Sequence, residues 1–344
     1  MASNPTSLIY AHNAAPIQRH LARDDVSELV INAPGMVGLE TRSGWEWHEE
    51  PALDNAALMT LAKLIAGLTK QDINSEYPIC SSVLPGGERA QVVVPPAVEQ
   101  GFISITIRKA SGVTMTIDDF ERAGVFSEVR AHGLHADVDG ELQRHRDAGD
   151  WTAFFRRAVE ARKNILISGA TGSGKTSFSK GLIKLIPDDE RILTIEDTRE
   201  LVVPQRNHVH MMYAKDGKSL QKAGAKELLE SALRMRPDRI LLQELRDGTA
   251  FFYLRNVNSG HPGSITTVHA NTAEGAFEQL TLLVKESEGG NDLDRHDIRA
   301  LLRSLVDIVV QMHRLPPGDG QPARYRMTEV WFDPASKSRE GGGK

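Results

Sequence analysis

The sequence predicts an α/β protein in which a parallel-sheet C-terminal domain follows a smaller α+β N-terminal domain. The main observation is a regular alternation of short apolar runs and helical patterns after residue 151, which is typical of a mostly parallel sheet with helices on both faces. A second observation is the mixture of a hairpin pattern, an amphipathic helix and alternating strands over residues 1–110. The length of 344 residues and the hydrophobic content of 40% are sufficient for two cores.

Changes in composition divide the chain into four segments. We expect an N-terminal α+β domain at 1–112, a linker at 113–150, the parallel-sheet domain at 151–335 and a disordered tail at 336–344. The linker segment is rich in charge, Gly, Ala and His and has few large apolar residues, so we expect it to be extended or partly helical.

The N-terminal domain contains one hairpin pattern, one helix and two further strands. MVGLETRSGWEWHEE predicts a hairpin that turns at Ser43-Gly44, and Asn55 is the expected cap of the helix that follows. QVVVPP and FISITIRK read as strands. The second strand predicts one buried face, because its isoleucines alternate with small polar residues: Ile103, Ile105 and Ile107.

The C-terminal domain shows five apolar runs separated by four helical patterns. We expect strands at 164–168, 191–195, 239–243, 264–268 and 306–312, and helices at 176–186, 225–236, 248–259 and 273–285.

Bulk properties restrict the class of protein. A net charge of −5 with a pI near 6.2 argues against nucleic acid as the main ligand. The single cysteine, Cys80, forms neither an internal disulfide nor a structural zinc site, which fits a reducing compartment. We find no signal-peptide pattern at the N-terminus and no apolar run near the roughly 20 residues that span a bilayer. We therefore expect a soluble protein, or one attached to a membrane only peripherally.

A phosphate-binding loop follows the strand at 164–168. The stretch from Gly169 to Thr176 matches G-x-x-x-x-G-K-[ST] between a strand and a helix, which favours this interpretation over a glycine-rich turn with a chance lysine. Glycines let backbone N–H groups converge on phosphate oxygens at the helix N-terminus. Lys175 is expected to neutralise β- and γ-phosphates, and the Thr176 hydroxyl to bind Mg²⁺. The residues expected to line the nucleotide are Gly169, Ala170, Thr171, Gly172, Ser173, Gly174, Lys175, Thr176 and Ser177.

Two acids end strands that lie downstream of this loop. Ligands of a parallel sheet lie at the carboxyl ends of its strands, so Glu196 is expected on the nucleotide side, where it orients or deprotonates the attacking water. Glu244 is expected as the acid on the Mg²⁺ side. The alternative for both is an ordinary solvated acid at a strand end.

Two histidines flank the strand at 264–268. His269 leaves the strand on the nucleotide side, where it can sense the third phosphate, whereas His261 lies before the strand, at its far end or on a connecting loop. The alternatives are a structural histidine for His269 and a loop histidine near a subunit surface for His261. A metal site is not indicated, because no third ligand is evident nearby.

These segments, taken in order, resemble a known family. GATGSGKT, TIEDTREL, LRMRPDRILLQELRD and SGHPGSITTVHAN look like the four nucleotide boxes of the secretion (traffic) ATPases, and most closely those of type IV secretion systems. The likeness is strong over roughly 150–315 and weaker in the N-terminal unit. Two positions depart from the family pattern: Gln243 stands where glycine is usual, and Arg199 where proline is common.

The resemblance implies a RecA-like C-terminal domain, ATP bound between the two domains and a ring of six subunits. It assigns catalytic roles to Lys175, Glu196, Glu244 and His269, and metal binding to Thr176 and, through water, to Glu244. It also implies that His261 belongs to the nucleotide site, and that Arg108, together with Arg89, reaches towards the nucleotide. ATP and Mg²⁺ are the implied cofactors.

The implied function is a hexameric, Mg²⁺-dependent ATPase of a type IV secretion system that powers protein or DNA–protein export, pilus assembly or both. Its expected location is the cytoplasmic face of the inner membrane, and its expected partners are other ATPases and inner-membrane components of the machine. No strong direct nucleic-acid binding is expected. The alternatives are a type II secretion or type IV pilus motor, a DNA-translocating motor and a small-molecule kinase.

Overall fold

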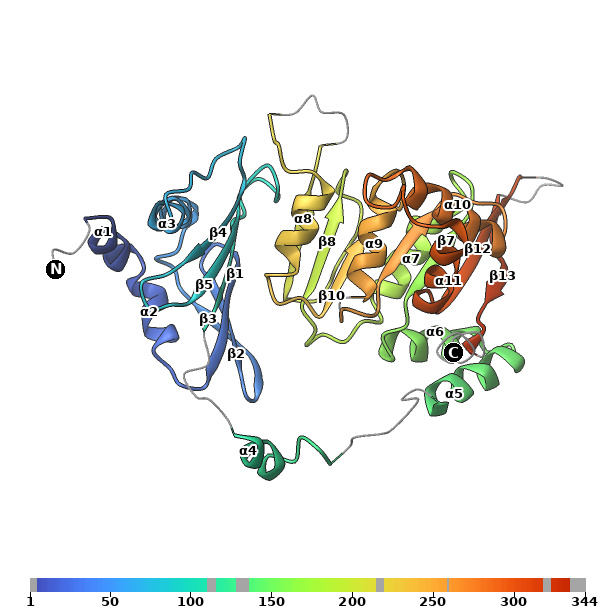
Figure 1. Cartoon of the computed structure of the whole chain (residues 1–344), viewed down its shortest axis with the longest axis horizontal. Coiled ribbons are helices and arrows are strands. Elements are labelled where there is room, and N and C mark those ends of the chain that lie inside the picture. Colours follow the sequence, from blue (N-terminus) through green and yellow to red (C-terminus); the bar gives the residue numbers. More distant parts are fainter. Residues whose placement is uncertain are drawn as a thin grey trace.

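The computed structural model describes residues 5–109, 116–127, 136–214, 220–258, 260–317 and 323–334. An N-terminal sheet with helices on its outer side lies beside a second, larger α/β unit (Figure 1). A segment that carries α4 and α5 runs between them along one side of the molecule (Figure 1). The tail at 336–344 lies outside the described residues.

The N-terminal unit is built on a six-stranded antiparallel sheet of order β3-β2-β1-β6-β5-β4. The hairpin predicted at Ser43-Gly44 is present, but Gly44 already pairs with Thr41, so the turn falls at Arg42 and Ser43. The strands are β1 (Val26–Ala33), β2 (Met36–Thr41), β3 (Gly44–Glu49), β4 (Ile79–Val83), β5 (Arg89–Val93) and β6 (Ser104–Arg108).

Helices cover the outer face of this sheet: α1 (Pro5–Asn13), α2 (Ala15–Leu21) and α3 (Asn55–Leu68). The cap of α3 is Asp54, whose carboxylate accepts from the N–H of Ala57, and not Asn55 as the sequence suggested. Strand β6 differs from the prediction of one buried face, since Ser104 and Thr106 are buried as fully as the isoleucines between them. The second face is covered because the C-terminal unit packs on it.

The C-terminal unit contains two sheets with the orders β10-β8-β9 and β11-β7-β12-β13, and its pairs are parallel except for β12 with β13. A parallel bridge between Glu244 and Thr267 joins them. All five predicted strands are present, and two more were not predicted, β9 and β13. The strands are β7 (Ile165–Ser168), β8 (Ile192–Glu196), β9 (His208–Met212), β10 (Arg239–Leu242), β11 (Ile265–Val268), β12 (Ile308–Leu315) and β13 (Arg324–Trp331).

Helices flank these strands, and the four predicted ones are present. Helix α8 ends four residues before its predicted end, ahead of Arg236, which has a positive φ of 55°. None of the helices in the described ranges is both long and apolar enough to cross a membrane. Helix α4 (Ile117–Arg122) lies apart, in the segment between the two units (Figure 1). The helices that follow it are α5 (Ala136–Asp147), α6 (Trp151–Glu160), α7 (Lys175–Ile183), α8 (Ala225–Ala232), α9 (Thr249–Asn258), α10 (Ala273–Glu286) and α11 (Arg295–Leu305).

Part of the segment predicted as a linker is docked on the C-terminal unit. Helix α5 packs beside α6, with Leu142 fully buried in the same core as Phe154. Arg157 donates to Glu141 at 2.7 Å, and the Lys163 ammonium lies 2.6 Å from Asp139. Helix α5 therefore belongs to the C-terminal unit, and the segment that connects the two units consists of the residues before α5.

Candidate nucleotide site

The loop between β7 and α7 has the backbone shape that a phosphate cradle requires. Gly172 and Gly174 have positive φ values of 73° and 92°, a region that glycine enters at little cost. Gly169 is tightly enclosed, because a Cβ atom there would lie 2.5 Å from the Met312 carbonyl oxygen. Gly174 directly precedes α7, so the first N–H groups of this helix face the loop.

Lys175 is folded into this loop. Its ammonium donates to the carbonyl oxygens of Gly169 and Ala170 at 2.6 and 3.1 Å, and only 7% of the residue is exposed. Burial lowers the pKa of this amine below its ordinary value, while the negative charge of Glu244 acts in the opposite direction. The lysine is thus held where phosphate would bind, with loop carbonyls as its partners.

The residues of two other strand ends meet beside Lys175. His269 Nε2 lies 2.6 Å from Glu244 Oε1, and His269 Nδ1 lies 3.4 Å from Lys175 Nζ. Since a carboxylate only accepts, Nε2 carries the hydrogen and Nδ1 accepts from the lysine. Arg246 joins the group by pairing with both Glu244 and Asp197. Three of the predicted catalytic residues are therefore in one connected cluster.

Glu196, the fourth predicted catalytic residue, is placed differently. It is fully buried, and its carboxylate accepts from the Thr194 hydroxyl at 2.7 Å and from the backbone N–H groups of Glu200 and Leu201 at 2.8 Å each. His210 Nδ1 lies 3.2 Å from the same carboxylate. Burial raises the pKa of Glu196, but these hydrogen bonds, that with His210 first, outweigh it and hold the pKa below its ordinary value. In this conformation Glu196 has no oxygen free for a water molecule.

The remaining loop residues fit a nucleotide. Ala170, Thr171, Gly172 and Ser177 are exposed, and Thr176 is half-buried at the start of α7. The Ser173 hydroxyl is buried and has no hydrogen-bond partner within the described part of the chain. Such an orphaned polar group inside the loop is what a phosphate oxygen would satisfy.

The structure does not bring Arg89, Arg108 and His261 to this loop. Arg89 begins β5 and pairs with Arg108 at the end of β6, and both line a pocket that also contains His261. His261 precedes the amino end of β11, whereas His269 follows its carboxyl end. Strand β11 runs parallel to β7, so its carboxyl end lies on the side of the phosphate loop and its amino end on the opposite side. The two histidines therefore lie at opposite ends of the strands.

Several residues that shape the site carry no recognisable signal in the sequence. Arg246 follows Glu244 by two positions, and Asp197 follows Glu196 directly, but only the folded sheet shows that they pair. His210 and Thr194 lie on neighbouring parallel strands, at register partners of β9 and β8. Since β9 was not predicted, the histidine had no assigned place.

A phosphate loop at the carboxyl edge of a parallel sheet, flanked by an acid and a histidine from adjacent strands, defines a nucleotide-hydrolysing protein of the P-loop class. The family model described as "Type II/IV secretion system protein" matches residues 60–321. The type IV secretion system protein VirB11 of Bartonella henselae is 52% identical over 99% of this chain and 98% of its own length. The corresponding protein of Brucella suis is 42% identical over 94% of this chain and 90% of its own length.

A solved structure agrees with these sequence relationships. The crystal structure of the VirB11 ATPase from the Brucella suis type IV secretion system, in complex with sulphate, matches with a TM-score of 0.90 and 39% identity, and covers 98% of both chains. The chain belongs to the type II/IV secretion system protein family, and within it to the type IV secretion traffic ATPases. It is an ATP-hydrolysing enzyme.

Proposed function

We propose that the loop from Gly169 to Ser177 binds the phosphates of ATP, and that hydrolysis there drives motion between the two units of a type IV secretion motor. The observation that carries this proposal is the position of Lys175, whose ammonium occupies the loop and is held by two carbonyls that a phosphate chain would replace. A relative, the Brucella suis VirB11 ATPase, was crystallised in complex with sulphate, an oxyanion of phosphate geometry.

Mg²⁺ fits the donors that the loop offers. Thr176 carries the hydroxyl next to the lysine in the chain, and the Glu244 carboxylate lies in the cluster beside Lys175 through its contact with His269. When bound, the ion would neutralise charge on the β- and γ-phosphates. We propose Thr176 as the direct ligand and Glu244 as the water-mediated one.

The cluster around His269 is suited to report which nucleotide is bound. When Lys175 turns to a γ-phosphate, it leaves the Nδ1 atom of His269, whose other nitrogen holds Glu244. The hydrogen bond between His269 and Glu244 then depends on whether Lys175 contacts His269 or phosphate. Arg246 pairs with both Glu244 and Asp197, so it links this change to Asp197. His269 is proposed as a sensor that acts through these contacts.

Glu196 is proposed as the group that acts on water, with one requirement set by its surroundings. One of its oxygens must first be released from Thr194 and His210, or from the N–H groups of Glu200 and Leu201. Nucleotide binding would therefore have to move β9 or the segment after β8. If Glu196 stays buried during turnover, Glu244, which contacts His269, is the next candidate for this role.

The test of the nucleotide site is the Lys175→Ala variant of the full chain. We expect it to lose ATP turnover and most ATP affinity, because the ammonium is the charge that contacts the β- and γ-phosphates. Turnover is measured by phosphate release and binding by calorimetry with Mg²⁺. The matched control is Lys184→Ala, which removes an exposed lysine at the end of α7 and should leave both unchanged. Normal turnover in Lys175→Ala would refute the proposed site.

We further propose that the chain divides functionally into an N-terminal domain at 1–112, a connecting segment at 113–150 and an ATPase domain at 151–335, and that six copies form a ring. Other ATPases and inner-membrane components of the secretion machine would be its partners, at the cytoplasmic face of the membrane. The mass of the assembly in solution, with and without ATP and Mg²⁺, tests the ring.

A further inference from the structure

The carboxylate of Glu196 is held by two sets of donors. Its Oε2 atom accepts from the backbone N–H groups of Glu200 and Leu201, which belong to the segment after β8. Its Oε1 atom accepts from two side chains, the Thr194 hydroxyl at 2.7 Å and Nδ1 of His210 at 3.2 Å. Release of one oxygen to a water molecule therefore requires a change in only one of the two sets.

His210 is the donor in the second set that comes from a different strand. Because a carboxylate only accepts, Nδ1 carries the ring hydrogen. The same nitrogen lies 2.8 Å from the Thr194 oxygen, so His210 holds Glu196 both directly and through the Thr194 hydroxyl. His210 is only 5% exposed, and it is the register partner of Thr194 in the parallel pair of β8 and β9. The position of β9 thus determines whether Oε1 keeps this donor.

The second ring nitrogen of His210 makes no competing contact. Nε2 is buried and has no hydrogen-bond partner among the described residues. His210 lines a pocket of about 110 Å³ together with Ser104 of β6, whose buried hydroxyl has no partner in the same ranges. This pocket has room for a water molecule that satisfies both groups. Within the described chain, the hydrogen bonds of the ring therefore go only to Thr194 and Glu196.

Strand β9 is attached to the N-terminal unit along its outer edge. It lies at the end of the sheet order β10-β8-β9. On the side away from β8, Met211 forms an antiparallel bridge with Val98, and the N–H of Met212 donates to the Ala97 carbonyl at 2.9 Å. Ala97 and Val98 belong to the segment that follows β5. A movement of this segment therefore displaces β9, and His210 with it.

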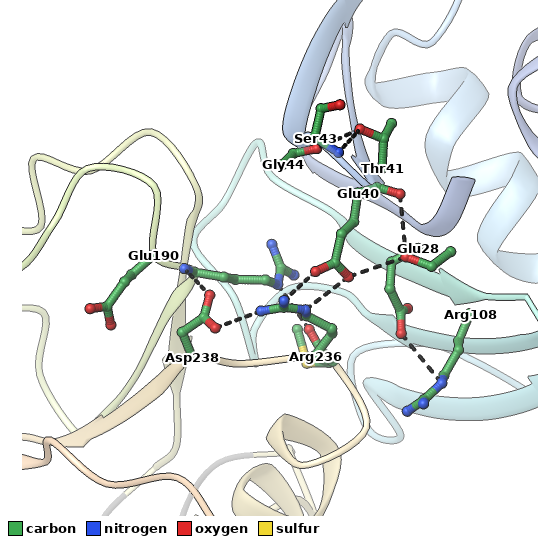
Figure 2. Close-up of polar contacts among 12 residues, drawn as sticks. Glu28, Glu40, Thr41, Ser43, Gly44, Arg108, Glu190, Arg236 and Asp238 are labelled. Carbon is green, nitrogen blue, oxygen red and sulfur yellow. Dashed lines mark hydrogen bonds and ion pairs between the residues drawn. The ribbon is translucent and has the colours of Figure 1, made fainter. Parts of the chain in front are cut away.

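A separate polar network attaches the N-terminal unit near the opposite end of β8. Arg236 lies between Glu40 of β2 and Asp238, which directly precedes β10 (Figure 2). Asp238 also accepts from the backbone N–H of Arg191, just before β8, at 2.7 Å. A rotation of the N-terminal unit about these contacts would displace β9 most at its carboxyl end, which is level with Glu196.

We propose that His210 is a positioning residue of the ATPase reaction, which holds Glu196 away from water while the N-terminal unit is bridged to β9 and releases it when that unit moves. The inference rests on the proposed role of Glu196 as the group that acts on water. The cleavage rate of bound ATP then scales with the fraction of chains in which Glu196 is released.

The sheet order predicts that His210 affects cleavage and not ATP affinity. Three strands, β8, β10 and β11, separate β9 from β7, whose carboxyl end carries the phosphate loop. A variant of His210 should therefore change the rate at which bound ATP is cleaved, whereas the contacts of the loop with the phosphates stay as they are.

The experiment measures single-turnover cleavage of bound ATP and, by calorimetry, ATP affinity, both on the full chain with Mg²⁺. His210→Phe keeps an aromatic ring but removes the Nδ1 donor, so we expect cleavage about tenfold faster and an unchanged affinity. His210→Asn should cleave at the wild-type rate, because its amide nitrogen is attached to Cγ, as Nδ1 is, and donates to Glu196 in its place. A purely structural role would neither raise the rate nor be rescued in this way.

His208→Phe is the matched control. It makes the same change two residues earlier on β9, at a histidine whose ring centre lies 4.9 Å from that of His210. The ring of His208 contacts the Gln205 carbonyl at 2.6 Å instead of Glu196, so His208→Phe should cleave at the wild-type rate. Glu196→Gln supplies the second comparison, since in this background His210→Phe should no longer accelerate cleavage.

A disulfide between β9 and the N-terminal unit tests the second part of the proposal. The variant with Val98→Cys and Met211→Cys places cysteines at two directly bridged positions of an antiparallel pair, where the Cα separation suits a disulfide. The oxidised chain should bind ATP but cleave it about tenfold more slowly than the same chain after reduction, because Glu196 stays held. Adding His210→Phe should remove most of this difference.

The outcomes separate this inference from the proposed role of Glu196. If Glu196→Gln cleaves ATP normally, that role is refuted and the inference fails with it. If Glu196→Gln is slow but His210→Phe is no faster than the wild type, only the inference is overturned, as it is if the acceleration persists in Glu196→Gln. Equal cleavage by the oxidised and reduced chains overturns the link to the N-terminal unit. If His210→Phe does not fold, Thr194→Val replaces it with the same expected acceleration, because it removes the other side-chain donor to Oε1.

Discussion

Lys175 shows how much of a site the sequence specifies for a single residue and where it stops. The motif predicts a phosphate-binding lysine at this position, but it does not predict that the lysine is buried against two loop carbonyls. Removing Lys175 takes away two hydrogen bonds, which lowers the free energy of unfolding. It also takes away a buried charge, which raises the free energy of unfolding. A sequence pattern identifies which type of residue stands at a position. Which groups that residue contacts when no ligand is bound depends on the backbone around it.

The buried carboxylate of Glu196 leads to a testable prediction about stability. Glu196→Gln should lower the free energy of unfolding by about 2 kcal/mol near neutral pH, since an amide group cannot accept from all four donors. The pKa of Glu196 is lowered in the folded protein, so its ionised form contributes stability above the unfolded-state pKa. That contribution is lost as the pH falls through the folded-state pKa. The difference between wild type and variant should therefore be constant above about pH 5.5 and shrink below about pH 4.5.

Urea denaturation at a series of pH values measures this difference. Glu200→Gln is the control, because it makes the same chemical change four residues away on an exposed side chain. It should match the wild type at every pH. A Glu196→Gln variant as stable as the wild type at neutral pH would mean that the four hydrogen bonds do not stabilise the fold.

Strands and helices of the ATPase unit were predicted where their patterns are strong. Buried parallel strands read as short apolar runs, and the five such runs all became strands. Strand β9 was missed because HVHMM mixes two histidines with apolar residues. Strand β13 was missed because half of RYRMTEVW is charged or polar, as is typical of a strand at the sheet edge. Helix α5 was assigned to a linker, since Leu142, the one deeply buried residue among those from 138 to 147, gives no periodic signal.

The turn between β7 and α7 yields a prediction at the scale of elements. Gly169→Ala should lower the free energy of unfolding by about 3 kcal/mol, because its Cβ would lie 2.5 Å from the Met312 carbonyl oxygen of β12 and the two strands cannot move apart freely. Gly172→Ala should cost about 1 kcal/mol, from its positive φ alone, since open space surrounds that position. Chemical denaturation of the two variants gives the comparison, and equal losses would show that β12 does not confine the loop.

The arrangement of the two units is the part of the molecule that the sequence did not predict. It depends on polar contacts between distant segments, which leave no local pattern. Arg191 is the clearest case: it precedes β8, is fully buried, and donates to Asn32 and Thr106 of the N-terminal unit at 2.8 and 3.2 Å. The same buried contacts explain why Arg89, Arg108 and His261 line a pocket between the units and do not approach the phosphate loop.

Arg191→Ala should therefore weaken the packing of one unit on the other. Within its own unit the side chain also donates to the Met235 carbonyl at 2.8 Å and to Asn207, so its loss leaves several buried acceptors without a donor. Burial lowers the pKa of Arg191 to about 9, which shows that placing this charge inside the protein opposes part of the gain. We expect a net loss of about 3 kcal/mol in the free energy of unfolding.

Arg206→Ala is the control variant. It tests whether the loss of any arginine between the two units lowers the free energy of unfolding as much as the loss of Arg191. Arg206 also crosses between them, with its guanidinium 4.7 Å from the Trp47 ring centre, but it is exposed. An exposed contact of this kind is worth less than about 1 kcal/mol, so Arg206→Ala should unfold close to the wild type. Equal stability of the two variants would mean that the buried network does not hold the units together. A loss confined to Arg191→Ala would mean that the buried contacts at the amino end of β8 hold the two units together.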